Sequence, residues 1–397
     1  MNQGGQGGLE DTRPRIVILA NNVDEIGGVQ RVVHALAKGL AGRGYPVTVV
    51  GVVPHEDRHP YAVDGAYVVH RLLQTRMPPL VEASSLRQRA DLKVRSQGRA
   101  WRAARMQSAR ALQDLLDSGH PGIVIATQLG TMELLGMCDL GDPASDTRWR
   151  VIAQYHSSLE AAVRSGDLTR AQVACRDADL FALLTAEDAQ AFTAYGLDNT
   201  TWMENPLQAW PQVPTDPLSR VVTFLGRYTG LKAPEVLLDA WRLLGEGSAE
   251  VIQGWSLRMY GSGPDEGRIR EVAERMDGVQ VFGATSDPLG VLAAGSILAM
   301  PSLEEGMPLV LAEAMSLGLA CVATNCSSGV RALVQDGVTG LLVERGDAAS
   351  LAAGLARVMA SPELRESLGA AARLRVERMQ EDRILDRWEH VIRDVLR

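Results

Sequence analysis

Short apolar runs alternate with helix-like segments along most of the chain. The run RIVILA at 15–20 is followed by a polar loop, and then by a segment at 29–44 in which apolar residues recur every three or four positions. Nearly continuous apolar strands that alternate with amphipathic helices are typical of a parallel sheet covered on both faces. Further strands of this first sheet are predicted at 47–53, 122–127, 150–156 and 180–185.

The pattern is interrupted by a proline-rich segment and then starts again. Prolines at 206, 211, 214 and 217 have a spacing that neither a helix nor a strand tolerates, so we expect a linker between domains. Each later strand is followed by a helical stretch, and these strands are predicted at 221–227, 256–260, 279–283, 296–302, 320–324 and 340–343.

Two doubly wound α/β domains are therefore expected, which agrees with 397 residues at about 100 to 200 residues per domain. Ligands of such folds bind beyond the carboxyl ends of the strands, so the site is predicted in the cleft between the two halves. The glycine-rich residues 1–13 are expected to form a disordered tail. No apolar run is long enough to predict a signal peptide or a membrane span.

Composition narrows the class of protein. Hydrophobic residues make up 46% and charged residues 22%, as in an ordinary soluble globular protein, and the net charge of −8 disfavours a nucleic-acid binder. The four cysteines lack the paired spacing of a zinc site or a disulfide framework, which favours a reducing, cytoplasmic location.

One segment departs from this acidic balance. Residues 86–110 hold eight lysines and arginines, Arg87, Arg89, Lys93, Arg95, Arg99, Arg102, Arg105 and Arg110, against the single acid Asp91. A solvated helix face is the plainer interpretation. The alternative is a contact with a phosphorylated acceptor or with anionic lipid, which would place the protein peripherally at the inner face of the membrane.

The stretch SLEEGMPLVLAEAM places Glu305 and Glu313 around an apolar run. A strand is predicted to end before it, and Pro308 suits the first helical position because it lacks an N–H. The free amides of Leu309 and Val310 would then form an anion site. Glu313 can accept two hydrogen bonds from a vicinal diol such as a ribose, although a structural carboxylate paired with an arginine or a backbone amide is an open alternative.

Cations and glycines follow other predicted strands. Arg227 and Lys232 suit a diphosphate whose charge grows as a glycosidic bond breaks, whereas a plain surface pair is the alternative. Gly261 begins a glycine loop that resembles a dinucleotide fingerprint with one interval a residue too long.

The first half offers three further candidates. Gly27 and Gly28 lie where the first strand leads into its helix, so they either bring backbone amides near a phosphate or sugar or form a plain tight turn. His156 ends a predicted strand and is either a hydrogen-bonding or acid–base group of the cleft or a structural histidine.

Together these residues resemble the retaining glycosyltransferases of family 4, whose GT-B architecture has two Rossmann-like domains facing across a cleft. The matching elements are GGVQRVV, ADLFALLTAEDAQAFTAYG, ENPL, FLGR with Lys232, MYGSGP, VFG, the E-x7-E pair Glu305 and Glu313, and CSSGVRALVQDGVTGLLV. The resemblance implies an acceptor domain at 14–206, a nucleotide-sugar domain at 207–379 and a helix at 380–397 that crosses back to the first domain.

The resemblance also implies a role for each candidate. Glu313 would hold the ribose, Glu305 and His156 would lie by the donor sugar, and Arg227 and Lys232 would hold the diphosphate. The remaining donor-binding positions would be the base-reading Phe282 and Gly283, the phosphate- and sugar-binding turn of Gly306, Met307, Leu309 and Val310, and the loop glycines Gly27, Gly28 and Gly261.

The implied activity is that of a hexosyltransferase. It would move a sugar with retained configuration from a UDP- or GDP-sugar to a small-molecule, lipid-linked or polymer acceptor, without a metal or another cofactor. Asp177 and Asp179 resemble a metal-binding DxD but precede a strand as a helix end does. Ala233 and Ala332 replace a glycine and an acid that are usual in the family. An epimerase, a phosphorylase and a non-catalytic sugar-nucleotide-binding partner are the alternatives.

Overall fold

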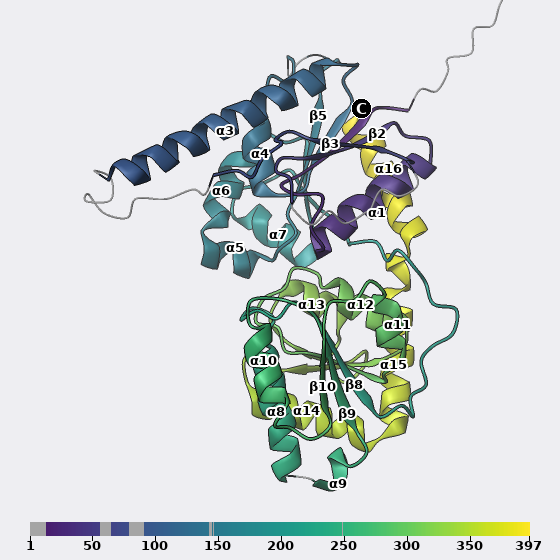
Figure 1. The fold of residues 1–397 in the computed structure, drawn as a ribbon. Helices are drawn as coiled ribbons and strands as arrows, with labels where there is room; N and C mark the ends of the chain where they lie inside the picture. Colours follow the sequence, from purple (N-terminus) through teal and green to yellow (C-terminus); the bar gives the residue numbers. More distant parts are fainter. Residues whose placement is uncertain (1–12, 56–64, 79–90, 143–144, 146, 248) are drawn as a thin grey trace, which may run out of the picture. The chain divides into compact units, whose positions relative to one another are not determined.

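A computed structural model of the chain describes residues 13–55, 65–78, 91–142, 145, 147–247 and 249–397 (Figure 1). Most of the predicted tail and residues 86–90 of the basic segment lie outside these ranges. Within the described residues, no helix has the length and apolar character needed to cross a membrane.

The first sheet has seven strands in the order β3-β2-β1-β4-β5-β6-β7. Its strands are β1 Ile16–Ala20, β2 Val47–Gly51, β3 Val68–Arg71, β4 Ile123–Ala126, β5 Arg150–Gln154, β6 Leu180–Leu183 and β7 Thr200–Trp202. The intervening helices are α1 Gly28–Gly42, α3 Leu92–Asp117, α4 Leu129–Leu135, α5 Leu159–Ser165, α6 Asp167–Ala174 and α7 Ala186–Ala194.

The second sheet has six strands in the order β10-β9-β8-β11-β12-β13, and neighbouring strands are parallel. The strands are β8 Val221–Leu225, β9 Ser256–Tyr260, β10 Val279–Phe282, β11 Ile297–Met300, β12 Ala320–Thr324 and β13 Leu341–Val343. The helices are α8 Pro234–Gly247, α9 Ala249–Ile252, α10 Glu266–Ala273, α11 Pro288–Ala293, α12 Leu309–Ser316, α13 Ser328–Leu333, α14 Ala348–Ala360, α15 Pro362–Val376 and α16 Glu381–Val395, with a short 3₁₀ turn at Glu377–Met379.

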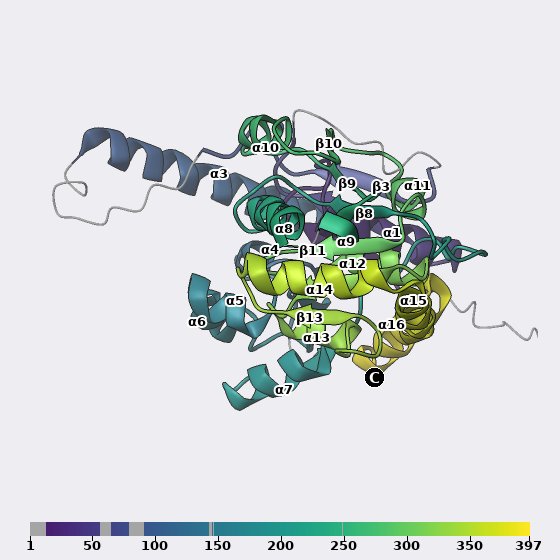
Figure 2. The same cartoon turned by 90° about the horizontal axis from the view of Figure 1, so that it is seen from below.

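The apolar runs of the second sheet form strands because both of their faces are buried. In β11, Ile297 and Ala299 belong to one apolar cluster, whereas Leu298 and Met300 belong to another. The first cluster packs under α8 and α14, which lie side by side (Figure 2). The second packs chiefly under α11, α12, α13 and α15. The predicted doubly wound α/β architecture with two parallel sheets is confirmed.

Every predicted strand is present, usually shorter by one to three residues than its apolar run. The pattern missed β3 and β7, the two edge strands of the first sheet. In β3 the residues alternate between exposed and half-buried, so there is no continuous apolar run to read. The strand β7 has only three residues.

The chain divides into two compact units. The first contains Met1–Gln154, Ala174–Phe181 and Glu389–Arg397, and the second contains Tyr155–Val173 and Ala182–Trp388. The proline-rich segment lies within the second unit, where Leu207 N donates to Met379 O and Thr215 N donates to Leu317 O, both at 2.8 Å.

Candidate active site

Lys232 and Glu305 form an ion pair in the second unit. Lys232 lies on the loop between β8 and α8, and Glu305 lies on the loop between β11 and α12. Because β8 and β11 are neighbouring parallel strands, both loops leave the same edge of the sheet. The Lys232 Nζ atom lies 2.6 and 2.7 Å from the two carboxylate oxygens of Glu305. Two predicted site residues are thus in direct contact.

The two partners differ in exposure. The Glu305 side chain is 7% exposed, whereas that of Lys232 is 30% exposed. A carboxylate at that depth needs a partner, and Lys232 supplies it. The exposed part of Lys232 leaves its charge accessible to an anionic ligand. Burial, followed by the charge of Glu305, raises the pKa of the Cys326 thiol to about 11, so this cysteine is a neutral thiol near pH 7.

The loop that carries Lys232 is tight. The amides of Lys232 and Ala233 both donate to Thr229 O, at 3.0 and 3.1 Å, and the exposed Arg227 lies at the start of the same loop. Ala233 has a φ of 47° and is the one non-glycine residue with positive φ in the described part of the chain. The left-handed conformation favours glycine and costs other residues about 1 to 2 kcal/mol. Ala233 therefore adopts a strained backbone conformation, which the tight turn of this loop imposes on it.

Tyr228 is a site residue that the sequence reasoning missed. Its hydroxyl lies 2.9 Å from the carbonyl oxygens of both Met259 and Phe282, and its amide donates to Ser262 O at 2.9 Å. Burial raises the pKa of this phenol well above its usual range. Tyr228 therefore holds together three loops at the carboxyl ends of β8, β9 and β10. Its only sequence signal was its position directly after Arg227.

Two glycines of the loop after β9 lie too close to neighbouring backbone atoms to carry a side chain. A Cβ atom on Gly261 would lie 1.9 Å from Gly226 O, and one on Gly263 would lie 2.3 Å from Tyr228 O. Gly267 has open space around it. The resemblance to a dinucleotide fingerprint thus has a structural cause in the first two glycines, namely the close approach of this loop to the β8 loop.

Phe282 and Tyr260 form an aromatic pair at the ends of β10 and β9. Their rings are stacked with centroids 4.6 Å apart and planes 12° apart. Phe282 remains 38% exposed, and the carbonyl of the following Gly283 accepts a hydrogen bond from Gly261 N at 3.2 Å. An exposed ring beside ordered backbone is a surface on which a planar base can stack.

Gly306 packs between two other backbone segments. A Cβ atom on Gly306 would lie 2.3 Å from His156 O, and one on Gly329 would lie 1.7 Å from Gly306 O. The Met307 carbonyl accepts a hydrogen bond from Asn205 Nδ2 at 3.3 Å, and the Gly306 carbonyl accepts one from Ser327 Oγ at the same distance. The turn before α12 is therefore fixed from three sides.

Helix α12 begins one residue later than predicted. Pro308 is its N-cap, with ψ at 116°, and Leu309 is the first helical residue. No side chain caps this end, so the amides of Leu309 and Val310 stand in the first turn without a side-chain acceptor. Glu313 lies on the same helix, where it is 5% exposed among the buried Leu311, Ala312, Ala314 and Met315.

His156 lies two residues after the end of β5 and belongs to the second unit. Its Nε2 atom is buried and has no hydrogen-bond partner among the described residues. Burial lowers the pKa of the imidazole from 6.5 to about 4, so the ring is neutral near pH 7. Its carbonyl touches Gly306, which places His156 beside the turn that carries Glu305. A neutral imidazole can donate or accept one hydrogen bond there, as a sugar hydroxyl requires.

We expect the His156 ring to remain neutral at every pH between about 5 and 8. Since its folded pKa of about 4 lies below 6.5, its contribution to stability should be complete above pH 6.5 and be lost as the pH falls toward 4. Histidine NMR signals measured against pH, assigned with His156→Gln, test this. The same protein in denaturant is the reference, and a folded-state His156 signal that titrates near 6.5 would contradict the expectation.

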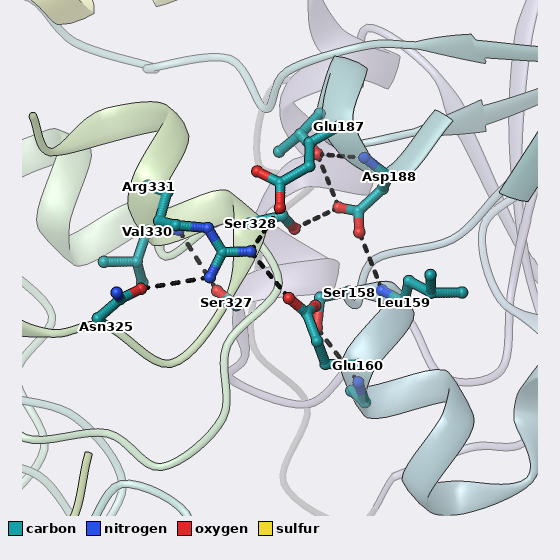
Figure 3. A network of polar contacts seen from close by, with 12 residues as sticks. Ser158, Leu159, Glu160, Glu187, Asp188, Asn325, Ser327, Ser328, Val330 and Arg331 are labelled. Atoms are coloured by element: carbon teal, nitrogen blue, oxygen red, sulfur yellow. Dashed lines mark hydrogen bonds and ion pairs between the residues drawn. The ribbon is translucent and has the colours of Figure 1, made fainter. Parts of the chain in front are cut away.

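Arg331 on α13 is held by two acids from other helices of the second unit. Its guanidinium lies 2.8 Å from Glu160 on α5 and 2.5 Å from Glu187 on α7, and it also donates to Asn325 Oδ1 at 3.2 Å (Figure 3). Burial opposes ionisation of Glu160, but the bond from Arg331 lowers its pKa below the usual value. The sequence reasoning missed this cluster because its members are far apart along the chain.

Asp188 joins the same helices at greater depth. It is 2% exposed, and its carboxylate accepts hydrogen bonds from Leu159 N at 2.9 Å, Thr185 Oγ1 at 2.7 Å and Ser328 Oγ at 2.5 Å (Figure 3). These bonds fix the start of α13, where Gly329 meets the Gly306 turn. The network of Arg331 and Asp188 therefore supports the Gly306 turn indirectly, by fixing the helix α13 that packs against it.

Ala332, the second departure from the family pattern, also lies on α13. Its carbonyl oxygen accepts hydrogen bonds from Arg375 Nη2 at 2.9 Å and from Arg378 Nη2 at 3.2 Å. Its backbone thus has a structural contact that needs no acidic side chain.

Gly27 and Gly28 belong to the first unit. Gly27 is the N-cap of α1 in extended conformation, and Gly28 is the first helical residue, so the helix begins one residue earlier than the predicted 29. A Cβ atom on Gly27 would meet only the flexible Gln30 side chain, and one on Gly28 would meet nothing within 4 Å. The fold of the first unit therefore does not itself demand a glycine at 28.

Asp179 has a structural role in the first unit. One carboxylate oxygen accepts hydrogen bonds from Val151 N at 2.8 Å and Arg148 Nη1 at 3.0 Å, and the other pairs with Arg148 and Arg150. Among the described residues there is no cluster of three or more His, Cys, Asp or Glu side chains arranged to hold a metal ion.

Two family models match the chain. The model described as Glycosyltransferase Family 4 matches residues 26–206, and the model described as Glycosyl transferases group 1 matches residues 219–361. The chain belongs to glycosyltransferase family 4. The second match contains the Lys232–Glu305 pair, and the first contains His156, Gly27 and Gly28.

Relatives of this family 4 chain include an uncharacterized glycosyltransferase of Haemophilus influenzae, 30% identical over 177 residues, or 44% of this chain. That match spans 49%, about half, of the Haemophilus protein. The amylovoran biosynthesis glycosyltransferase AmsD of Erwinia amylovora is 23% identical over 95% of this chain and 99% of its own length.

The fold is GT-B. Among solved structures, that of Anabaena HepE in complex with UDP-glucose has a TM-score of 0.71 and 16% identity, covering 96% of this chain and 100% of HepE. Such a low identity supports the architecture alone.

Proposed function

We propose that this family 4 chain is a retaining hexosyltransferase, which moves a sugar from a UDP- or GDP-sugar to a small-molecule, lipid-linked or polymer acceptor. The contact of Lys232 with Glu305 carries the proposal. A partly exposed ammonium held by a buried carboxylate is suited to bind a diphosphate. When the Lys232 ammonium turns to the diphosphate, the Glu305 carboxylate can accept a hydrogen bond from a sugar hydroxyl.

The other donor contacts belong to the same proposal. Arg227 and the amides of Leu309 and Val310 bind phosphate oxygens, because an uncapped helix start favours an anion. The bidentate hydrogen bond of Glu313 with the ribose and the stacking of the base on Phe282 complete the donor site. HepE, which shares this fold, binds UDP-glucose, and this supports UDP as the first nucleotide to test.

In the proposed reaction the bond between the sugar C1 and the diphosphate oxygen breaks, and its electron pair leaves with the phosphate. The acceptor hydroxyl attacks C1 from the face that the diphosphate leaves, and its proton passes to the departing oxygen. The configuration at C1 is thereby retained. Lys232 and Arg227 offset the charge that grows on the leaving group, without a metal or another cofactor.

A thermal-shift panel of UDP-, GDP- and ADP-sugars should identify one donor class that stabilises the protein. Glu313→Ala should then weaken the binding free energy of the nucleotide by roughly 1.5 to 3 kcal/mol, which is the contribution of one charge-assisted hydrogen bond. Glu271→Ala removes an exposed carboxylate of the same unit and is the matched control. Unchanged nucleotide affinity in a folded Glu313→Ala protein would remove this residue from the ribose site.

Acceptor screening with the stabilising donor tests the reaction itself. Turnover that persists in a chelator, with an α-linked product from an α-donor, is the expected result. Conversion of the donor to an epimer without acceptor would instead show an epimerase. A requirement for inorganic phosphate would show a phosphorylase. Binding of the donor without turnover on any acceptor would support a non-catalytic binding protein.

A further inference from the structure

Helix α3 of the first unit presents a basic stripe to solvent. We define the arginine stripe as Leu92, Arg95, Arg99, Arg102, Met106 and Arg110, which follow one another at intervals of three or four residues and so share one helix face. All six are exposed. The arginine stripe extends for about 27 Å at ~1.5 Å per residue.

The solvent-exposed part of α3, residues 92–107, carries charges of one sign only. Residues 92–107 contain five lysines and arginines and no acid, in a protein whose net charge is −8. Asp91, just before the helix, has its carboxylate bound to Lys93 N at 2.7 Å as the N-cap. Arg105 lies off the arginine stripe, where it pairs with Glu133 at 3.5 Å and stacks over Trp101. No arginine of the stripe has an ion pair with any residue that the structure describes.

Packing does not account for these residues. The buried side chains of α3 are Ser108, Ala109, Leu112 and Leu116, all in its last turns, and none of residues 92–107 is buried. Like charges at neighbouring positions of a helix repel one another and weaken it. A long exposed helix segment that carries uncompensated charge gains stability when it meets a surface of opposite charge.

We propose that the arginine stripe docks on the surface of an anionic membrane. Its arginines are spread along the helix, so they cannot converge on a single phosphate, but they match a plane of many anionic headgroups. Two apolar side chains share the stripe with the arginines, Leu92 at its start with 77% exposure and Met106 between Arg102 and Arg110 with 47%, and both can enter the headgroup boundary. A nucleic acid has no such boundary for the apolar side chains to enter, so DNA serves as a competitor in the test.

Co-sedimentation with vesicles tests the proposal and does not depend on the proposed enzymatic activity. The full chain should bind vesicles that contain phosphatidylglycerol and should not bind vesicles of phosphatidylcholine alone. Combined Arg95→Gln, Arg99→Gln and Arg102→Gln should weaken this binding roughly a hundredfold, as expected for three basic residues near the surface. Leu92→Ser with Met106→Ser should weaken it further, because their apolar contact is lost.

The matched control makes the same change of charge elsewhere. Arg242, Arg275 and Arg393 are exposed arginines of the described chain outside α3, and their combined change to glutamine should leave vesicle binding within a few-fold. Equal losses in the two triple variants would overturn the proposal, because net charge would then explain the binding. Failure of the full chain to bind anionic vesicles would also overturn the proposal. So would release of the bound chain from its vesicles by inorganic phosphate or by DNA as effectively as by competing anionic vesicles. Melting curves and unchanged nucleotide affinity confirm that the stripe variant is folded and that its donor site is intact.

Discussion

Lys232→Ala is expected to lower kcat by a factor of about 100 to 1,000, the usual loss when one group that stabilises the charge of a transition state is removed. The ammonium is paired with the buried Glu305 and is itself partly exposed, so it is placed to meet the leaving diphosphate. Single-turnover kinetics with the identified donor would measure the loss. A variant with undiminished kcat would exclude Lys232 from the proposed reaction.

The same change should also destabilise the protein, because it leaves the Glu305 carboxylate buried without its cation. We expect a loss of about 1 to 3 kcal/mol in the free energy of unfolding. Adding Glu305→Gln to Lys232→Ala should restore much of that stability and none of the turnover. Arg383→Ala removes the cation of an exposed pair with Glu377 in the same unit, and as the control it should cost less than about 1 kcal/mol.

Gly329→Ala is expected to damage both folding and donor binding. The new methyl would lie 1.7 Å from Gly306 O and 2.9 Å from Met307 Cα, and these backbone atoms cannot rotate away as a side chain can. We expect a loss of about 3 kcal/mol or more in the free energy of unfolding. If the turn yields instead, a shift of about 1 Å in Gly306 and Met307 should lower turnover about a hundredfold.

Gly267→Ala is the matched control for that substitution. It also adds one methyl to a helix of the second unit, but the methyl meets nothing within 4 Å. It should leave turnover unchanged and raise the free energy of unfolding by about 0.5 to 1 kcal/mol. Denaturant titrations of both variants make the comparison. A Gly329→Ala protein as stable and as active as the wild type would show that α13 does not support the Gly306 turn.

Much of the site could be predicted because its residues follow buried strands. Glu305 and Lys232 lie in loops that follow strands, Phe282 is the last residue of β10, and parallel strands deliver their ends to a common edge. The supporting residues were not predictable in this way. Tyr228 and Asp188 act through contacts with loops and helices that are remote in the sequence, and neither has a local pattern that marks it.

The start of α12 shows the limit of local rules. The missing N–H of Pro308 predicted it at the first helical position, whereas the structure has it one residue earlier, as the N-cap. The packing of Gly306 against His156 and Gly329 determines the path of the chain into the helix, with Pro308 as the cap.

The amino-acid sequence by itself determined two parallel sheets and the chemical groups at their edges, because buried strands require continuous apolar runs and the polar residues after them have few other places to lie. Only the tertiary structure decided which of those groups meet. The pairing of Lys232 with Glu305 joins positions 73 residues apart, and the support of Gly306 by Gly329 depends on a helix held by Arg331 and Asp188. Such contacts arise from the packing of several elements at once, and no periodicity along one segment encodes them.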